Sequence, residues 1–162
     1  MPVIRPLRLL LLGSLLLSAA CSSSPGYFEP AQPASNEALV YFYRPKADNP
    51  GMQPLRGSYP DVQIDGRSVG QLKFNSHFVV SLAPGSHEVR ITGLSKAADW
   101  EPRDIEQRVN VKAGEVKYLK LDVRFNLSEM NLGQPKPSYL IYLTPMRTDD
   151  ARYEIRDTAA QQ

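Results

Sequence analysis

One serine of the chain stands in a pattern that could support nucleophilic chemistry. Gly66-Arg67-Ser68-Val69-Gly70 has the G-x-S-x-G spacing of a serine-hydrolase nucleophile elbow. That elbow needs a strand before the serine, a helix after it, and then an acid and a histidine later in the chain. The following residues, QLKFNSHFVVSL, have no helical period, and no Asp or Glu lies between Ser68 and His87. We therefore expect no catalytic residue and no enzymatic activity.

A β-hairpin accounts for the same residues. Asp65-Gly66 is a two-residue turn signal, because glycine adopts positive φ without steric cost. Ser68 then begins the return strand, and Gly70 marks a bulge or a position of close packing.

The other groups that could do chemistry are too scattered to bind a metal. His77 and His87 lie ten residues apart, and Cys21 is the only cysteine, so no zinc-ligand spacing is present. His87 shares a face with Val89 and Ile91, and we expect it to be half-buried and structural. We predict no metal site and no cofactor. An acidic stretch lacks the spacing and glycine of a calcium loop and is interrupted by Arg103; it comprises Asp99, Glu101, Asp104 and Glu106.

The first twenty residues have the pattern of a secretory signal peptide. Arg5 and Arg8 precede an apolar run over residues 9–17, which is too short to span a bilayer, and small residues follow. The sequence LSAAC then resembles a bacterial lipobox, although Ser18 stands where leucine is favoured. This resemblance implies that Cys21 is lipidated, and several acyl chains give a stable anchor. Ordinary cleavage after Ala20 is the alternative, and it would leave a free thiol in an oxidising compartment.

The mature chain is electrically balanced. The full sequence has 19 Lys and Arg against 17 Asp and Glu, and removal of Arg5 and Arg8 leaves 17 against 17. This balance argues against nucleic acid as a partner. Residues 21–36 are rich in Ser and Pro, and we expect them to form a flexible tether. Docking of Tyr27 and Phe28 on the domain, or at the lipid surface, is the alternative.

Residues 37–145 have the pattern of a single all-β domain. About eight segments with period-two alternation are separated by turn signals, which predicts an antiparallel, Ig-like β-sandwich. Residues 38–44 are apolar on both faces and predict a central strand, and residues 116–125 alternate between inward and outward positions. In the tail, residues 146–162, Thr148 is expected to cap a short helix that presents Ala151 and Ile155 on one face.

Two resemblances follow from these segments. VQIDGRSVGQ and SLAPGSHEVRITG, within residues 61–93, are similar to a PEGA-type domain, from which the chain departs at Gln71-Leu72. Over residues 37–145, the ALVYFYRP, DVQIDGRSVG, LAPGSHEV and AGEVKYLKL segments together resemble the bacterial lipoprotein family of domain of unknown function 2846. That resemblance implies a small extracytoplasmic β-sandwich, usually lipid-anchored, with no assigned activity. Ser22 after the cysteine implies outer-membrane sorting, with the domain facing the periplasm.

Loop length predicts which end of the sandwich carries a site. The long loops, 45–60, 94–104 and 126–138, are the first, fifth and seventh connections, whereas the tight turns are the second, fourth and sixth. If the strands alternate in direction, the long loops share one end. The tether enters the first strand at the other end, so we expect Asn49, Trp100 and Met130 to gather away from the membrane. Rigidly carried loops are where binding residues concentrate.

Two functions from different classes remain open. The first is a lipid-anchored interaction or scaffold module that binds another envelope component through its loops or a free strand edge. The second is a carbohydrate- or peptidoglycan-binding module that uses Tyr59 and Trp100 as stacking platforms. For Trp100 itself, a buried anchor of its own loop is the favoured interpretation, and an exposed recognition residue is the alternative.

Overall fold

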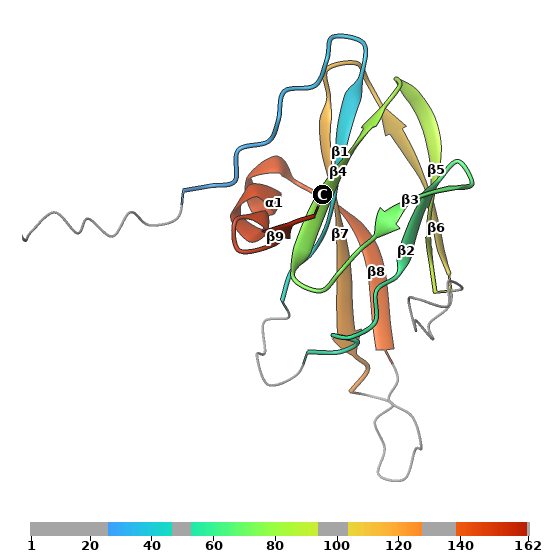
Figure 1. The fold of residues 1–162 in the computed structure, drawn as a ribbon, viewed down its shortest axis with the longest axis vertical. Helices are drawn as coiled ribbons and strands as arrows, with labels where there is room; N and C mark the ends of the chain where they lie inside the picture. Colours follow the sequence, from blue (N-terminus) through green and yellow to red (C-terminus); the bar gives the residue numbers. More distant parts are fainter. Residues whose placement is uncertain (1–25, 47–52, 94–103, 128–138, 162) are drawn as a thin grey trace, which may run out of the picture.

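The chain folds as a β-sandwich of two sheets with one helix on the outside. A computed structural model describes residues 26–46, 53–93, 104–127 and 139–161. Sheet A has the strand order β8-β7-β1-β4-β9, and sheet B has the order β3-β2-β5-β6 (Figure 1). The predicted β-sandwich of about eight strands with a short C-terminal helix is confirmed, and the described residues form nine strands. The elements are β1 (Ala38–Arg44), β2 (Asp61–Ile64), β3 (Arg67–Gln71), β4 (Ser76–Leu82), β5 (Gly85–Thr92), β6 (Ile105–Val111), β7 (Val116–Phe125), β8 (Tyr139–Met146), α1 (Thr148–Ile155) and β9 (Ala159–Ala160).

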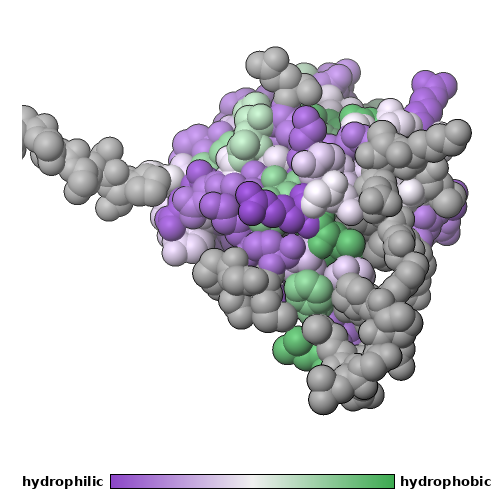
Figure 2. Space-filling view, turned by 60° about the horizontal axis from the view of Figure 1, so that its bottom comes forward, coloured by the Kyte–Doolittle hydropathy of each residue, from purple (hydrophilic) through white to green (hydrophobic). Residues whose placement is uncertain are grey.

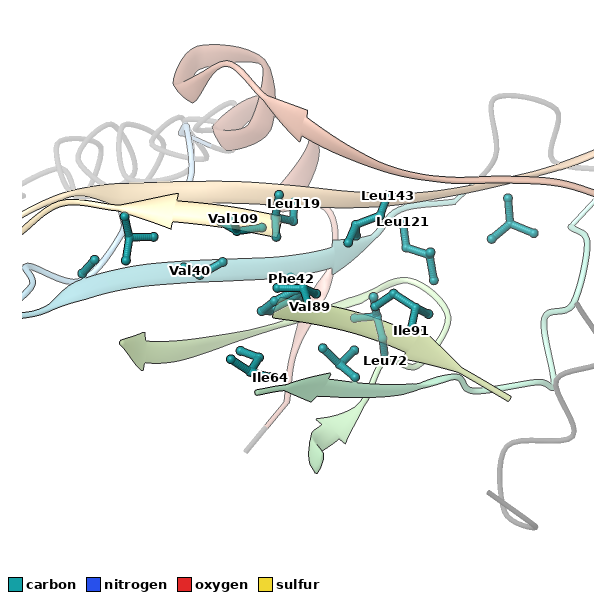
Figure 3. Packing of buried hydrophobic residues seen from close by; sticks show 14 residues of the cluster. Val40, Phe42, Ile64, Leu72, Val89, Ile91, Val109, Leu119, Leu121 and Leu143 are labelled. Carbon is teal, nitrogen blue, oxygen red and sulfur yellow. The ribbon is translucent and has the colours of Figure 1, made fainter. Parts of the chain in front are cut away.

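The main hydrophobic core lies between the two sheets. Alternate residues of β7 point into it, which confirms the period-two pattern of residues 116–125. Full burial of one such aliphatic or aromatic side chain stabilises the fold by about 1.5–3 kcal/mol. Figure 3 labels Val40, Phe42, Ile64, Leu72, Val89, Ile91, Val109, Leu119, Leu121 and Leu143 of this core.

A second apolar cluster covers the outer face of sheet A. Leu39, Tyr41 and Tyr43 of β1 point away from sheet B and pack against Ala151 and Ile155 of α1. Every residue of β1 is therefore buried, as its two apolar faces predict, and β1 occupies the centre of sheet A.

Sheet A is mixed rather than purely antiparallel, and here the sequence prediction was wrong. β1 pairs with β7 in parallel, with Tyr41 opposite Tyr118, and β4 pairs with β9 in parallel. The remaining ladders are antiparallel. β1 and β7 are separated by the whole of sheet B in the sequence, so no turn signal announces their pairing. The two strands still fit the predicted alternation of direction, because both are odd-numbered.

The hairpin predicted around Ser68 is present. Asp65 and Gly66 both have positive φ, 51° and 78°, which is the backbone that a two-residue hairpin turn requires. Ser68 lies on β3 opposite Gln63 of β2. The register shifts between Val62 and Gln63, opposite Gly70, so the predicted bulge is also confirmed.

The tail forms the predicted helix α1. It also forms the short strand β9, which the sequence did not predict. Arg147, rather than Thr148, is the N-cap residue, and it makes no side-chain capping hydrogen bond. Thr148 is instead the first helical residue. The buried helix face is the predicted one, Ala151 and Ile155. Within the part of the chain that the structure describes, no helix has the length and apolar character needed to cross a membrane.

Residues 26–36 lie against the domain along the outer face of sheet A. The ring of Phe28 contacts the rings of Tyr41 and His77, with centroids 5.3 and 5.1 Å apart. The amide of Ala31 donates to the hydroxyl of Tyr41 over 2.8 Å, and Arg152 donates to the carbonyl of Phe28 over 2.7 Å. Phe28 therefore docks on the domain, which was one of the alternatives for this residue. A flexible tether was expected over residues 21–36, and within it these contacts hold Phe28 and Ala31 against sheet A and α1.

Candidate functional site

The strand termini that bear the three long loops lie at one end of the sandwich, here called the loop end. Arg44, the last residue of β1, pairs with Ser76, and Asp61, the first residue of β2, pairs with Thr92 at the end of β5. Phe125 at the end of β7 pairs with Tyr139 at the start of β8. The short connection from Gln71 to Ser76 joins the same ends of the two sheets. The predicted sharing of one end is therefore confirmed for the strand termini.

The three tight turns lie together at the opposite end, here called the turn end. The amide of Gly114 donates to the carbonyl of Glu37 over 2.8 Å, directly before β1. Gly85 pairs with Val111, which brings the β4–β5 and β6–β7 turns side by side. Nδ1 of His87 lies 2.7 Å from the carboxylate of Asp65, which joins the β2–β3 turn to them.

Of the predicted binding residues, only Tyr59 is in the described part of the chain. It is partly buried at the loop end, in the segment that leads into β2. Asn49, Trp100 and Met130 lie outside the described residues, and so does Cys21. Figure 2 brings the loop end forward and shows hydrophobic side chains exposed among hydrophilic ones. Leu127, at 68% exposure, is the most exposed of the large hydrophobic residues that the structure describes.

Arg44 organises the loop end, and sequence reasoning missed it. Its side chain is only 2% exposed, and its guanidinium donates to the carbonyls of Ser58, Leu55 and Pro54 over 2.8, 2.8 and 3.0 Å. Burial lowers the pKa of Arg44 to about 10, so the side chain stays protonated at neutral pH. One fork of donors therefore fixes the turn over residues 54–58.

The fixed turn presents a cationic and aromatic surface. The guanidinium carbons of Arg44 and Arg56 lie 5.7 and 5.5 Å from the ring centroid of Phe74. Arg56 is exposed, whereas Arg44 is buried, so only one of the two cations reaches solvent. Leu55 holds a positive φ of 54° inside this turn, where the three carbonyl hydrogen bonds compensate for the strain.

Ser68 and the two histidines lie apart, each with other partners. Ser68 is exposed and donates to the carboxylate of Asp61 over 2.5 Å. Nε2 of His87 lies 2.8 Å from the carbonyl of Ala83, and its Nδ1 faces Asp65. Since both partners are acceptors, the hydrogen bond to Asp65 and then that to Ala83 raise the pKa of His87. The predicted half-buried, structural position of His87 agrees with these contacts.

His77 is buried between the outer face of sheet A and the tail. The hydroxyl of Thr158 donates to the carbonyl of Ile155 over 2.7 Å, so Nδ1 of His77 donates to Thr158, also over 2.7 Å. Burial lowers the pKa of His77, which favours the neutral ring.

Only Asp104 and Glu106 of the acidic stretch belong to the part of the chain that the structure describes, and both contact Arg90. Asp99 and Glu101 lie outside the described residues. Asp104 accepts two hydrogen bonds from Arg90, over 2.6 and 2.9 Å, and Glu106 lies 3.6 Å from the same guanidinium. Among the described residues, no group of three or more His, Cys, Asp or Glu side chains is arranged to hold a metal ion.

A polar cluster joins α1 to the outer face of sheet A. The buried hydroxyl of Tyr43 donates to Glu154 over 2.7 Å, and Lys120 donates to the second oxygen of Glu154, also over 2.7 Å. Burial and the carboxylate of Glu154 raise the pKa of Tyr43. These contacts hold the helix in place and offer no free nucleophile.

An open groove runs along the side of the sandwich where β6 and β8 are the outermost strands. Its volume is about 390 Å³. Two carboxylates, Asp104 and Glu106, line one wall, and the edge of β8 forms the other. The full lining is Asp104, Ile105, Glu106, Ile141, Tyr142, Leu143, Thr144 and Pro145.

Comparison with known proteins establishes the family but no activity. No curated protein matches the chain. A family described as "Protein of unknown function (DUF2846)" matches residues 34–133, which is well over half of the 162 residues. The match spans β1 to β7 and therefore both sheets, while β8, α1 and β9 follow it. The chain belongs to the DUF2846 family.

Proposed function

We propose that the protein is a lipid-anchored, non-enzymatic module of the cell envelope that binds another envelope component through its loop end. The observation that carries this proposal is the grouping of three loop-bearing pairs of strand termini around a turn that Arg44 fixes. A rigid scaffold of this kind holds binding loops at a low entropic cost.

The anchor is the proposed diacylglyceryl group on Cys21, in the outer membrane and facing the periplasm. Residues 21–26 extend at most about 3.3–3.6 Å per residue, so Cys21 lies within about 17 Å of Gly26. Gly26 precedes Phe28, which is seated beside His77 and Tyr41 rather than at the turn end. The expectation that the loop end points away from the membrane assumed that the tether approaches the domain at the turn end, and the position of Phe28 does not support that assumption. We propose instead that the outer face of sheet A lies near the lipid.

The contacts of Ser68 and the histidines support a function without catalysis. A nucleophilic serine of the elbow type needs a histidine base within about 2.6–3.2 Å. Ser68 has an aspartate partner, and His77 and His87 are occupied by other residues. The PEGA-type likeness of residues 61–93 stays a prediction, and it concerns turns and strands rather than the long loops.

Paired variants at the two ends of the domain test the proposal. Arg56→Ala removes an exposed cation at the loop end, and Arg67→Ala removes an exposed cation at the turn end as a matched control. Each full-length protein is captured from solubilised envelopes. We expect a discrete co-purifying protein with the wild type and Arg67→Ala, and reduced recovery with Arg56→Ala and Trp100→Ala. Equal recovery with all variants would contradict a site at the loop end.

Glycan binding is the second candidate. It is favoured by Tyr59, whose side chain is partly exposed at the loop end. Sedimentation with purified peptidoglycan tests it: binding that is lost in both Tyr59→Ala and Trp100→Ala supports a carbohydrate-binding module. Sedimentation that neither substitution changes would exclude stacking on these two residues.

A further inference from the structure

β8 differs from the other sheet edges in having no strong protection against pairing. Exposed strand edges are templates for another chain, and proteins protect them with charges, bulges or short length. Among the described strands, β3 has 5 residues and a register shift, β9 has 2, and β6 carries the exposed charges of Glu106 and Arg108. β8 has 8 residues, YLIYLTPM, and none is charged. Its one interruption is Pro145, next to its C-terminal end.

We propose that β8 is a dimer interface, in which the β8 edges of two copies of this chain pair antiparallel about a two-fold axis. Self-pairing requires an uncharged strand, because side chains near the axis face copies of themselves. β8 meets this requirement along its whole length.

Pro145 sets the register of the proposed pairing. A proline is tolerated in a strand where its nitrogen points away from the neighbouring strand. Pro145 pairs opposite Leu119 of β7, so its nitrogen belongs on the open edge. Backbone groups alternate in direction along a strand, so those of Ile141 and Leu143 share that edge. Centring the pair on Ile141 joins these groups and leaves Pro145 beyond the paired stretch.

This register also covers the exposed apolar side chains of β8. Leu140 and Tyr142 are 37% and 53% exposed on the outer face of sheet A. With Ile141 on the axis, Leu140 of each copy lies directly opposite Tyr142 of the other. Such aromatic–aliphatic cross-strand pairs stabilise a sheet by about 0.2–1 kcal/mol each.

The path of the N-terminus agrees with a second copy of the chain as the occupant of the β8 edge. A two-fold axis that relates antiparallel neighbours stands perpendicular to the sheet, so both outer faces stay on the same side. The segment that begins at residue 26 runs past α1 on that side of the domain (Figure 1), where Phe28 contacts Tyr41 and Arg152. Both Cys21 residues then reach one bilayer within about 17 Å of chain. This step rests on the proposed lipid anchor, whereas the pairing of β8 does not.

Disulfide cross-linking in envelopes tests the register. In a non-hydrogen-bonded antiparallel pair the Cα atoms are about 4.5 Å apart, within the about 4.4–6.8 Å that a disulfide spans. The full-length Leu140→Cys/Tyr142→Cys double variant is oxidised beside the two single variants, Tyr153→Cys and the wild type, which controls for Cys21. Tyr153 is 52% exposed on α1 and matches Tyr142 in exposure.

We expect a covalent dimer in the double variant alone, because each single cysteine lies about 7–8 Å from its own copy. A monomer in every lane, or a dimer of equal yield with Tyr153→Cys, would overturn the proposal. A dimer with Tyr142→Cys alone would overturn the Ile141-centred register. A second readout is light scattering of the purified protein: Tyr142→Glu should lower the dimer fraction at least tenfold, whereas Tyr153→Glu should not. Recovery of the loop-end partner with Tyr142→Glu is measured separately. Because loop-end binding does not require the dimer, the two proposals can fail independently.

Discussion

Replacing Arg44 by methionine measures how strongly one buried cation supports the loop end. Arg44→Met keeps the length of the side chain but removes the donors to three carbonyls, those of Pro54, Leu55 and Ser58. Hydrogen bonds to a charged group contribute about 1.5–3 kcal/mol each. Loss of the buried charge also removes a desolvation penalty of several kcal/mol. We therefore expect a net loss of about 2–4 kcal/mol of unfolding free energy.

Urea denaturation of the purified protein measures this loss. The midpoint should fall while the slope with denaturant stays unchanged, because the surface exposed on unfolding is the same. The midpoint of Arg44→Lys should lie between those of the wild type and Arg44→Met, because one ammonium group cannot donate to three separated carbonyls. Arg56→Met, at an exposed position, should remain within about 0.5 kcal/mol of the wild type. An Arg44→Met protein as stable as Arg56→Met would refute the role given to the buried guanidinium.

The remaining predictions concern the anchor, the serine, one histidine and the helix contact. Cys21→Ser should block lipidation and move the protein from the membrane to the soluble fraction; normal processing of this variant would contradict the lipobox. Ser68→Ala removes the hydrogen bond to Asp61 and should cost about 0.5–1.5 kcal/mol of unfolding free energy, but it should not alter labelling by a fluorophosphonate probe. Because the pKa of His87 is raised in the folded protein, the stabilisation from its contact with Asp65 is fully present below pH 6.5 and is lost as the pH rises through the raised pKa. Because the pKa of Asp65 is lowered, the same stabilisation is fully present above pH 3.8 and is lost as the pH falls through the lowered pKa. The difference in unfolding free energy between wild type and His87→Gln, measured by urea denaturation across pH, should therefore be largest between pH 3.8 and pH 6.5. A difference that increases as the pH rises above 6.5 would contradict this role of His87. Tyr43→Phe removes the hydrogen bond to the Glu154 carboxylate and should cost about 1.5–3 kcal/mol, with hydrogen exchange increased in α1.

Local signals in the sequence predicted most of the fold. Asp65-Gly66 and Ala113-Gly114 specify turns by their backbone preferences, and the period-two pattern of residues 116–125 specifies one buried face. The apolar and aromatic residues on both faces of residues 38–44 predicted a central strand, and Tyr41 and Tyr43 lie on the outer face of sheet A. They could not show what covers it, because α1 and Phe28 are distant in sequence and only tertiary packing selects them.

The sequence predicted which end of the sandwich bears the long loops, but it did not predict the contacts that build this end. Counting strand directions placed the loop-bearing termini at one end, and the strand pairing agrees. Arg44 was missed because a charged residue at a strand end is normally exposed, and nothing nearby in sequence reveals its three carbonyl partners. The parallel pairing of β1 with β7 was missed for the same reason, since only long-range contacts define it.

Photocross-linking in living cells tests directly whether the protein binds its partner through the loop end. A photoreactive residue is placed singly at Arg56, Trp100 and Met130, and at the turn-end positions Arg67 and Ala113 as controls. We expect a discrete adduct from the loop-end positions and none from the turn-end positions. Adducts that form only at Arg67 or Ala113, or at no position although the protein is lipidated and folded, would contradict binding through the loop end.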